Sequence, residues 1–151
     1  MEKEGGELEG LKEQLLLRGY SKETIIAYSR VVGDFLKSGK SARQYILSKA
    51  DKSRSTLRST YFALQFYFKE VLKRDPRHEE ALQGMTEIAE RYADLVEKEL
   101  DQFDYSEAKK YLRRGLSVQP DNGRLLKLSE QTDILKDGPK RLVGKIKSLF
   151  D

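Results

Sequence analysis

The sequence has no cysteine and only one histidine, His78, among 151 residues. Without cysteine the chain forms no disulfide and offers no thiolate to a metal ion or to nucleophilic catalysis. One histidine is also too few for a histidine-based metal site, and it argues against a general-base triad. We therefore expect a non-enzymatic protein that is stabilised by packing alone and needs no cofactor and no metal.

Long apolar runs are missing as well. No stretch approaches the roughly 20 apolar residues that cross a bilayer. The first six residues, Met-Glu-Lys-Glu-Gly-Gly, lack the charged-then-apolar order of a secretory signal. Because 38% of the residues are hydrophobic, a buried core is still expected. The sequence thus predicts a globular protein without membrane association, cytoplasmic if the chain is natural.

Positive charge is concentrated in the first half of the chain, although the net charge is only +4. Residues 10–74 contain 14 Lys and Arg against 5 Asp and Glu, a net charge of +9. Residues 75–138 contain 10 against 15, a net charge of −5, and residues 139–151 carry +3. A surface for a polyanionic partner is therefore expected in the first half.

Helical spacing of apolar residues extends over nearly the whole chain, and no sustained alternation marks a strand. The pattern predicts an all-α fold of about eight helices. Gly19 ends the first helix, and Ser21 caps the second. The expected helices span residues 7–17, 21–38, 41–48, 55–73, 78–102, 104–118, 121–135 and 139–150.

The first unit resembles the small helical core-binding domain of tyrosine recombinases and phage integrases. The resemblance lies in Leu17-Arg-Gly-Tyr-Ser-Lys-Glu-Thr-Ile25 with Tyr28, in Arg54-Ser-Thr56, and in Ala63-Leu64 followed by Phe66-Tyr67. In that family two helical elements face DNA. The resemblance implies a DNA-facing surface made of Ser21, Lys22, Thr24, Tyr28, Arg54, Ser55, Thr56 and Arg58.

The residue types in this set suit phosphate binding in their own right. Hydroxyls and free amides at helix starts hold phosphate oxygens, and Lys22, Arg54 and Arg58 would neutralise phosphates. The alternative is that Ser21 and Ser55 are only helix caps and that the cations form a solvated face. The resemblance brings no catalysis, because recombinase chemistry belongs to a separate domain whose arginines and His-x-x-Arg element have no counterpart here.

The second half resembles a single tetratricopeptide repeat, the two-helix unit of about 34 residues. The residues that fit its pattern are Tyr92, Leu95, Val96, Ala108, Leu112, Gly115 and Pro120. A solitary repeat cannot bury its own face, so it needs neighbouring helices. Leu64, Phe68, Val71 and Pro76 have the same spacing as Ala108, Leu112, Gly115 and Pro120, which predicts that the integrase-like last helix also serves as a repeat helix.

The basic C-terminal segment places five apolar residues on one helical face and four cations on the other: Leu142, Val143, Ile146, Leu149 and Phe150 against Lys140, Arg141, Lys145 and Lys147. We expect it to cap the helical array with its apolar face. A helix lying on a membrane surface is the alternative.

The expected organisation is a charged leader over residues 1–6, an integrase-like unit over 7–76, repeat-like helices over 77–136 and the capping helix over 137–151. The favoured hypothesis is an engineered fusion of natural helical fragments, a scaffold without catalytic role and with at most residual DNA binding. The alternative hypothesis is a natural DNA-binding adaptor whose repeat-like half binds a protein partner.

Overall fold

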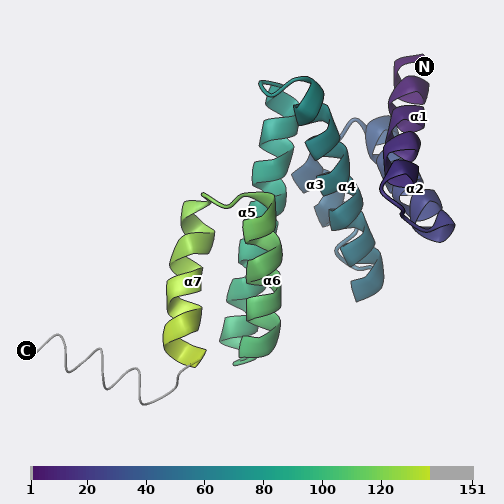
Figure 1. The fold of residues 1–151 in the computed structure, drawn as a ribbon. Helices are drawn as coiled ribbons and strands as arrows, with labels where there is room; N and C mark the ends of the chain where they lie inside the picture. Colours follow the sequence, from purple (N-terminus) through teal and green to yellow (C-terminus); the bar gives the residue numbers. More distant parts are fainter. Residues whose placement is uncertain (1, 137–151) are drawn as a thin grey trace, which may run out of the picture. The chain divides into compact units, whose positions relative to one another are not determined.

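The computed structural model describes the backbone of residues 2–136 and the side chains of residues 6–132. All regular structure in this part of the chain is α-helical, so the all-α prediction is confirmed (Figure 1). The described helices are α1 (Glu2–Leu17), α2 (Lys22–Ser38), α3 (Ala42–Ser48), α4 (Arg54–Arg74), α5 (Glu79–Asp101), α6 (Tyr105–Val118) and α7 (Gly123–Lys136). The predicted capping helix lies outside the described residues.

The chain divides into two compact units, unit 1 (Met1–Glu87) and unit 2 (Ile88–Asp151). The division falls inside α5, so the first turns of this helix belong to unit 1 and the remainder to unit 2. The domain boundary expected between residues 76 and 77 stays a prediction. None of the described helices has both the length and the apolar character that a membrane span requires.

Serine caps define the starts of α2, α3 and α4. The Ser21 hydroxyl accepts a hydrogen bond from the Thr24 amide at 3.2 Å, as the sequence predicted. Ser41 and Gln44 form a reciprocal capping box at the start of α3. At α4, however, the cap is Ser53, whose hydroxyl accepts from the amide three residues further on.

Two predicted helix starts therefore need correction. Helix α4 begins at Arg54 and not at Ser55, because Ser53 is the serine that accepts a hydrogen bond from the free Thr56 amide. Helix α1 begins at Glu2, not near Glu7, so the expected leader of residues 1–6 is part of the helix. Two adjacent glycines weaken a helix, but they do not end it as long as their φ angles stay negative. Neither Gly5 nor Gly6 has a positive φ.

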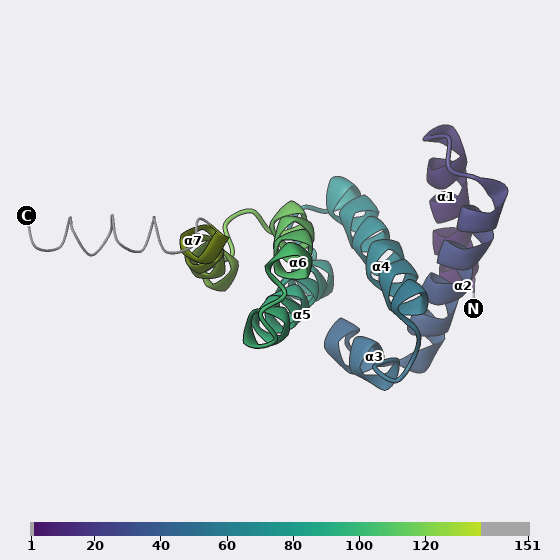
Figure 2. The same cartoon turned by 90° about the horizontal axis from the view of Figure 1, so that it is seen from below.

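The core of unit 1 is aromatic. Helix α2 packs against both α1 and α4, and the short α3 packs against α2 and α4 (Figure 2). The ring of Phe35 meets Tyr45 and Phe68 edge-on, with centroid separations of 5.5 and 5.7 Å. The first turns of α5 close this core, since a Cβ at Gly84 would lie 2.5 Å from the Phe68 ring.

His78 caps α5, accepting from the Ala81 amide through Nδ1 at 3.1 Å.

Unit 2 is built from the second part of α5 with α6 and α7, and α6 and α7 lie side by side in antiparallel order (Figure 1). Its core residues Tyr92, Val96, Ala108 and Leu125 are almost fully buried. Gly115 lets α6 pack closely against Tyr92 and Leu125, because atoms of these two residues lie within 3.0 Å of the position that a Cβ would take.

Phe103 ends α5 in a conformation that favours glycine. Its φ is +60°, and the side chain is 78% exposed. The Phe103 amide bonds to the Leu100 carbonyl and the Asp104 amide to the Glu99 carbonyl, the pair of bonds that closes many helices. Gly19 ends α1 with the same two bonds and a φ of +77°.

Candidate nucleic-acid interface

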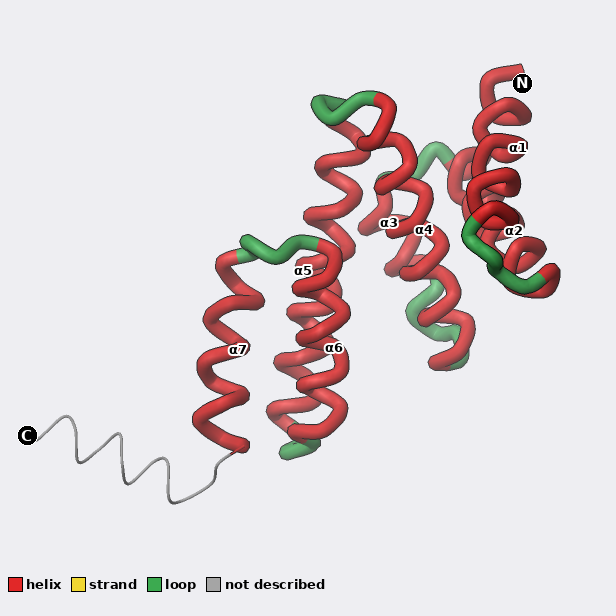
Figure 3. The backbone as a smooth tube through the Cα atoms, viewed as in Figure 1, coloured by secondary structure: helices red, strands yellow, loops and turns green. Residues whose placement is uncertain are grey.

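The starts of α2 and α4 share one local pattern. Each begins with a capping serine, continues with a cation at the first helical position and has a threonine at the third: Ser21, Lys22 and Thr24 in α2, and Ser53, Arg54 and Thr56 in α4. Figure 3 shows the loops that lead into the two helices at the same end of unit 1. The predicted DNA-facing elements are therefore presented in the same way.

The threonine hydroxyls complete both caps. The Ser21 hydroxyl donates to Thr24 Oγ1 at 2.9 Å, and Thr56 Oγ1 lies 3.0 Å from the Ser53 hydroxyl. Ser55 was expected to cap α4 and does not. It is exposed, with its hydroxyl 3.3 Å from that of Ser53. Its role in the predicted set is thus that of a surface hydroxyl beside the cap.

The predicted cations are exposed and unpaired within the described part of the chain. Lys22, Arg54 and Arg58 make no ion pair with any described side chain, whereas Arg18 and Lys73 of the same unit both bind Glu70. For Arg54 and Arg58 the sequence explains this difference, because residues 54–69 contain no Asp or Glu. The first turns of α4 therefore present positive charge that pairs with no described carboxylate.

The cations of α4 continue as a stripe along the helix. Arg54, Arg58, Phe62, Gln65 and Lys69 follow one another at separations of three or four residues, which places them on one helical face. The predicted set included only the first two of these residues. Lys69 is exposed and, within the described residues, unpaired.

An open cleft of about 180 Å³ connects this stripe to the start of α2. We call it the aromatic cleft. Besides Phe62 it is lined by Arg18, Tyr20, Tyr28, Gln65, Phe66 and Lys69. The structure thus brings Tyr28, from the first predicted DNA-facing element, next to the stripe that begins in the second.

The rings of the aromatic cleft are tilted relative to one another. Tyr20 lies 6.0 Å from Tyr28 at an interplanar angle of 50° and 5.7 Å from Phe66 at 80°. The Arg18 guanidinium lies 5.0 Å above the Phe66 ring and donates to Glu70 at 2.7 Å. Burial, and secondarily the neighbouring Tyr20, raises the pKa of the Tyr28 phenol, so this hydroxyl is neutral near pH 7.

The repeat-like residues of unit 2 occupy packing positions. Tyr92, Val96, Ala108, Leu112 and Gly115 are buried, Leu95 is half-buried and Pro120 is exposed just after α6. A Cβ at Gly115 would lie 2.8 Å from Leu125 Cδ1 and 3.0 Å from Tyr92 Cβ. Apart from Leu95 and Pro120, these residues belong to the interior of unit 2 and not to a surface site.

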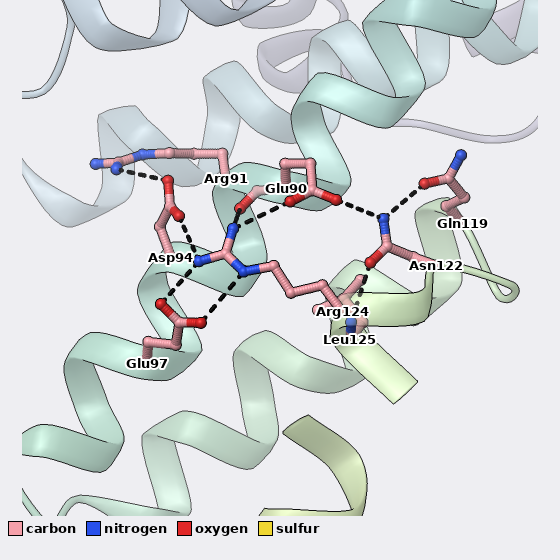
Figure 4. Close-up of polar contacts among 8 residues, drawn as sticks. All are labelled: Glu90, Arg91, Asp94, Glu97, Gln119, Asn122, Arg124 and Leu125. Carbon is pink, nitrogen blue, oxygen red and sulfur yellow. Dashed lines mark hydrogen bonds and ion pairs between the residues drawn. The ribbon is translucent and has the colours of Figure 1, made fainter. Parts of the chain in front are cut away.

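An ion-pair cluster around Arg124 holds the start of α7 against α5 (Figure 4). The guanidinium lies 3.0 Å from Glu90, 2.8 Å from Asp94 and 2.7 Å from Glu97. Asn122 donates to Glu90 at 3.0 Å while its carbonyl oxygen caps α7. The Asn122 amide and, further, Arg124 hold the pKa of Glu90 below its ordinary value.

Sequence reasoning missed both Gln65 and the Arg124 cluster. The acidic face of α5 is visible in the spacing of residues 90, 94 and 97, but its partner on α7 depends on how the helices pack.

Among the described residues no group of three or more His, Cys, Asp or Glu is arranged to hold a metal ion. Comparison with protein-family models, with curated proteins and with solved structures finds no match to this chain. The resemblances to integrases and to tetratricopeptide repeats stay predictions.

Proposed function

We propose that the chain is a non-catalytic helical protein whose unit 1 binds the phosphate backbone of nucleic acid. One observation carries this proposal: Lys22, Arg54 and Arg58 are exposed and unpaired within the described residues, beside two serine-capped helix starts. Unpaired cations at such positions are free to replace the counterions of phosphates. The exposed hydroxyl of Ser55 adds a hydrogen-bond donor next to them.

Contacts of this kind position a protein on nucleic acid without reading its sequence. The expected affinity for duplex DNA is therefore that of non-specific binding, with a Kd between about 10⁻⁶ and 10⁻⁴ M near physiological salt, and tighter at low salt. In the adaptor version of this proposal, unit 2 binds a protein partner while unit 1 holds DNA.

The test is fluorescence anisotropy of a labelled duplex of about 20 base pairs, long enough to hold several phosphate contacts. We expect Lys22→Glu/Arg54→Glu/Arg58→Glu to abolish binding at low salt. The matched control is Lys98→Glu/Arg113→Glu/Lys127→Glu, which changes the charge equally at exposed positions of unit 2. Equal loss in both triple variants would show that only net charge matters and would overturn the proposal.

A second candidate function is that of a scaffold, an engineered fusion of natural helical fragments whose purpose is the fold. It is favoured by the cluster of ion pairs and hydrogen bonds that joins α5 to the start of α7 within unit 2. Arg124 alone joins three carboxylates of α5, and Asn122 links one of these to the start of α7. Cooperative thermal unfolding without duplex binding at low salt would support the scaffold over the DNA-binding proposal.

A further inference from the structure

We propose that the aromatic cleft of unit 1 binds one unpaired nucleobase of a single-stranded nucleic acid. This inference rests on the proposed function, since it assigns a substrate class to the same face. It adds a base-binding site to phosphate contacts that do not distinguish one form of nucleic acid from another. Four features support it: an unpartnered amide oxygen, the exposed ring of Tyr20, the size of the cleft and its position along the cationic stripe.

The amide belongs to Gln65, whose side chain lines the aromatic cleft and is only 8% exposed. Its Oε1 atom is buried and accepts no hydrogen bond from any described residue. Buried polar atoms are nearly always partnered, and an unpartnered one is costly. A turn of the amide toward the cleft would let the N–H group of a ligand satisfy this oxygen.

Tyr20 offers the ring surface on which a base can stack, because its side chain is 38% exposed. It meets Tyr28 at 50° and Phe66 at 80°, so no parallel stack with either ring occupies this surface. The volume of about 180 Å³ is below the roughly 300 to 1,000 Å³ of pockets for drug-sized ligands, which suits a single planar ring system.

The position of the cleft selects a nucleic acid over other planar ligands. Lys69 lies at its edge, and Arg58 and Arg54 follow along the same face of α4. A strand lying on this face would place successive phosphates at these cations while one base enters the cleft. Bases in a duplex are stacked and paired, so a single strand supplies the base at the lowest cost.

The amide favours adenine among the bases. A glutamine side chain pairs with adenine through two hydrogen bonds, one accepted from the N6 amino group and one donated to N7. The Gln65 oxygen is the acceptor that this pairing needs. The phenol of Tyr28, neutral near pH 7, keeps the cleft free of negative charge beside the phosphates.

The test compares two labelled single strands with the full chain. One is a 12-residue oligo(dA), and the other is a strand of the same length made of abasic sugar phosphates, which carries the same charge. Stacking of one base on aromatic side chains predicts that oligo(dA) binds at least about fivefold more tightly. Equal affinities of the wild-type protein for the two strands would overturn the inference.

The variant Gln65→Leu assigns the site. Leucine removes the unpartnered oxygen and keeps the apolar bulk, so we expect thermal stability equal to or above that of the wild type. Binding of oligo(dA) should weaken by about fivefold, with binding of the abasic strand unchanged. Equal losses for both strands would contradict a base contact. Lys69→Gln is the comparison variant, and it should weaken both strands equally.

The outcomes separate this inference from the proposed function. If the duplex and the abasic strand bind but the bases add nothing, the base site is refuted and phosphate binding stands. If no nucleic acid binds at low salt, both are refuted. Tighter binding of oligo(dA) that Gln65→Leu reduces would establish the site.

Discussion

The substitution Gly115→Ala tests the packing of unit 2 most sharply. An added Cβ would lie 2.8 and 3.0 Å from the two Leu125 methyl carbons and 3.0 Å from Tyr92 Cβ. Leu125 is 0% and Tyr92 1% exposed, so neither side chain can move without disturbing the core. Overpacking of this kind costs about 1 to 3 kcal/mol, against a gain in helix propensity of about 1 kcal/mol. We expect a net loss of about 1 kcal/mol.

The assay is urea unfolding followed by circular dichroism, with Gly123→Ala as the control. A Cβ at Gly123 meets nothing within 4 Å, so this variant should gain about 0.5 kcal/mol. Trimming Leu125 to valine in the Gly115→Ala background should recover part of the loss, because the two sites are in contact. The reasoning is refuted if Gly115→Ala is as stabilising as Gly123→Ala.

Three further predictions concern single contacts. Phe103→Gly should raise the free energy of unfolding by about 0.5 to 1 kcal/mol in urea titrations. Glycine removes the backbone strain of a left-handed residue, and little packing is lost because the Phe103 side chain is exposed. Arg124→Gln should lower it by about 1 to 2 kcal/mol, less at high salt, since three surface carboxylates of α5 lose their common partner. Because the pKa of Glu90 is lower in the folded protein than in the unfolded chain, its ionised carboxylate stabilises the fold. This stabilisation is fully present above the ordinary pKa of about 4.5, and it is lost as the pH falls through the lower pKa of the folded protein. Glu90→Gln should therefore lose less stability than the wild type between pH 7 and pH 3; an identical loss would contradict this assignment.

The sequence predicted the helices well where local chemistry decides them. The cap at Ser21 and the left-handed end at Gly19 follow from residue preferences of the backbone alone. The cap of α4 was misplaced because Ser53 and Ser55 both suit a helix start, and only the geometry of the loop before α4 selects the first. Phe103 shows the opposite case, since no preference would place phenylalanine at a positive φ.

The candidate interface was predictable in its charges but not in its cleft. The sequence itself shows the surplus of cations before residue 75 and the serines at the helix starts. In the sequence Gln65 is one polar residue within an apolar run. Its burial beside Tyr28 could not be predicted, because it depends on how α2 crosses α4. The same limit applies to Arg124, whose three partners belong to another helix.

The most direct measurement of the central claim is the salt dependence of duplex binding. Each phosphate contact contributes about −0.9 to the slope of the logarithm of the binding constant against the logarithm of salt concentration. We expect Lys22→Gln/Arg54→Gln/Arg58→Gln to reduce the magnitude of this slope by about 2.7, and Lys98→Gln/Arg113→Gln/Lys127→Gln to leave it unchanged. An unchanged slope in the first variant would mean that these three cations do not contact phosphates.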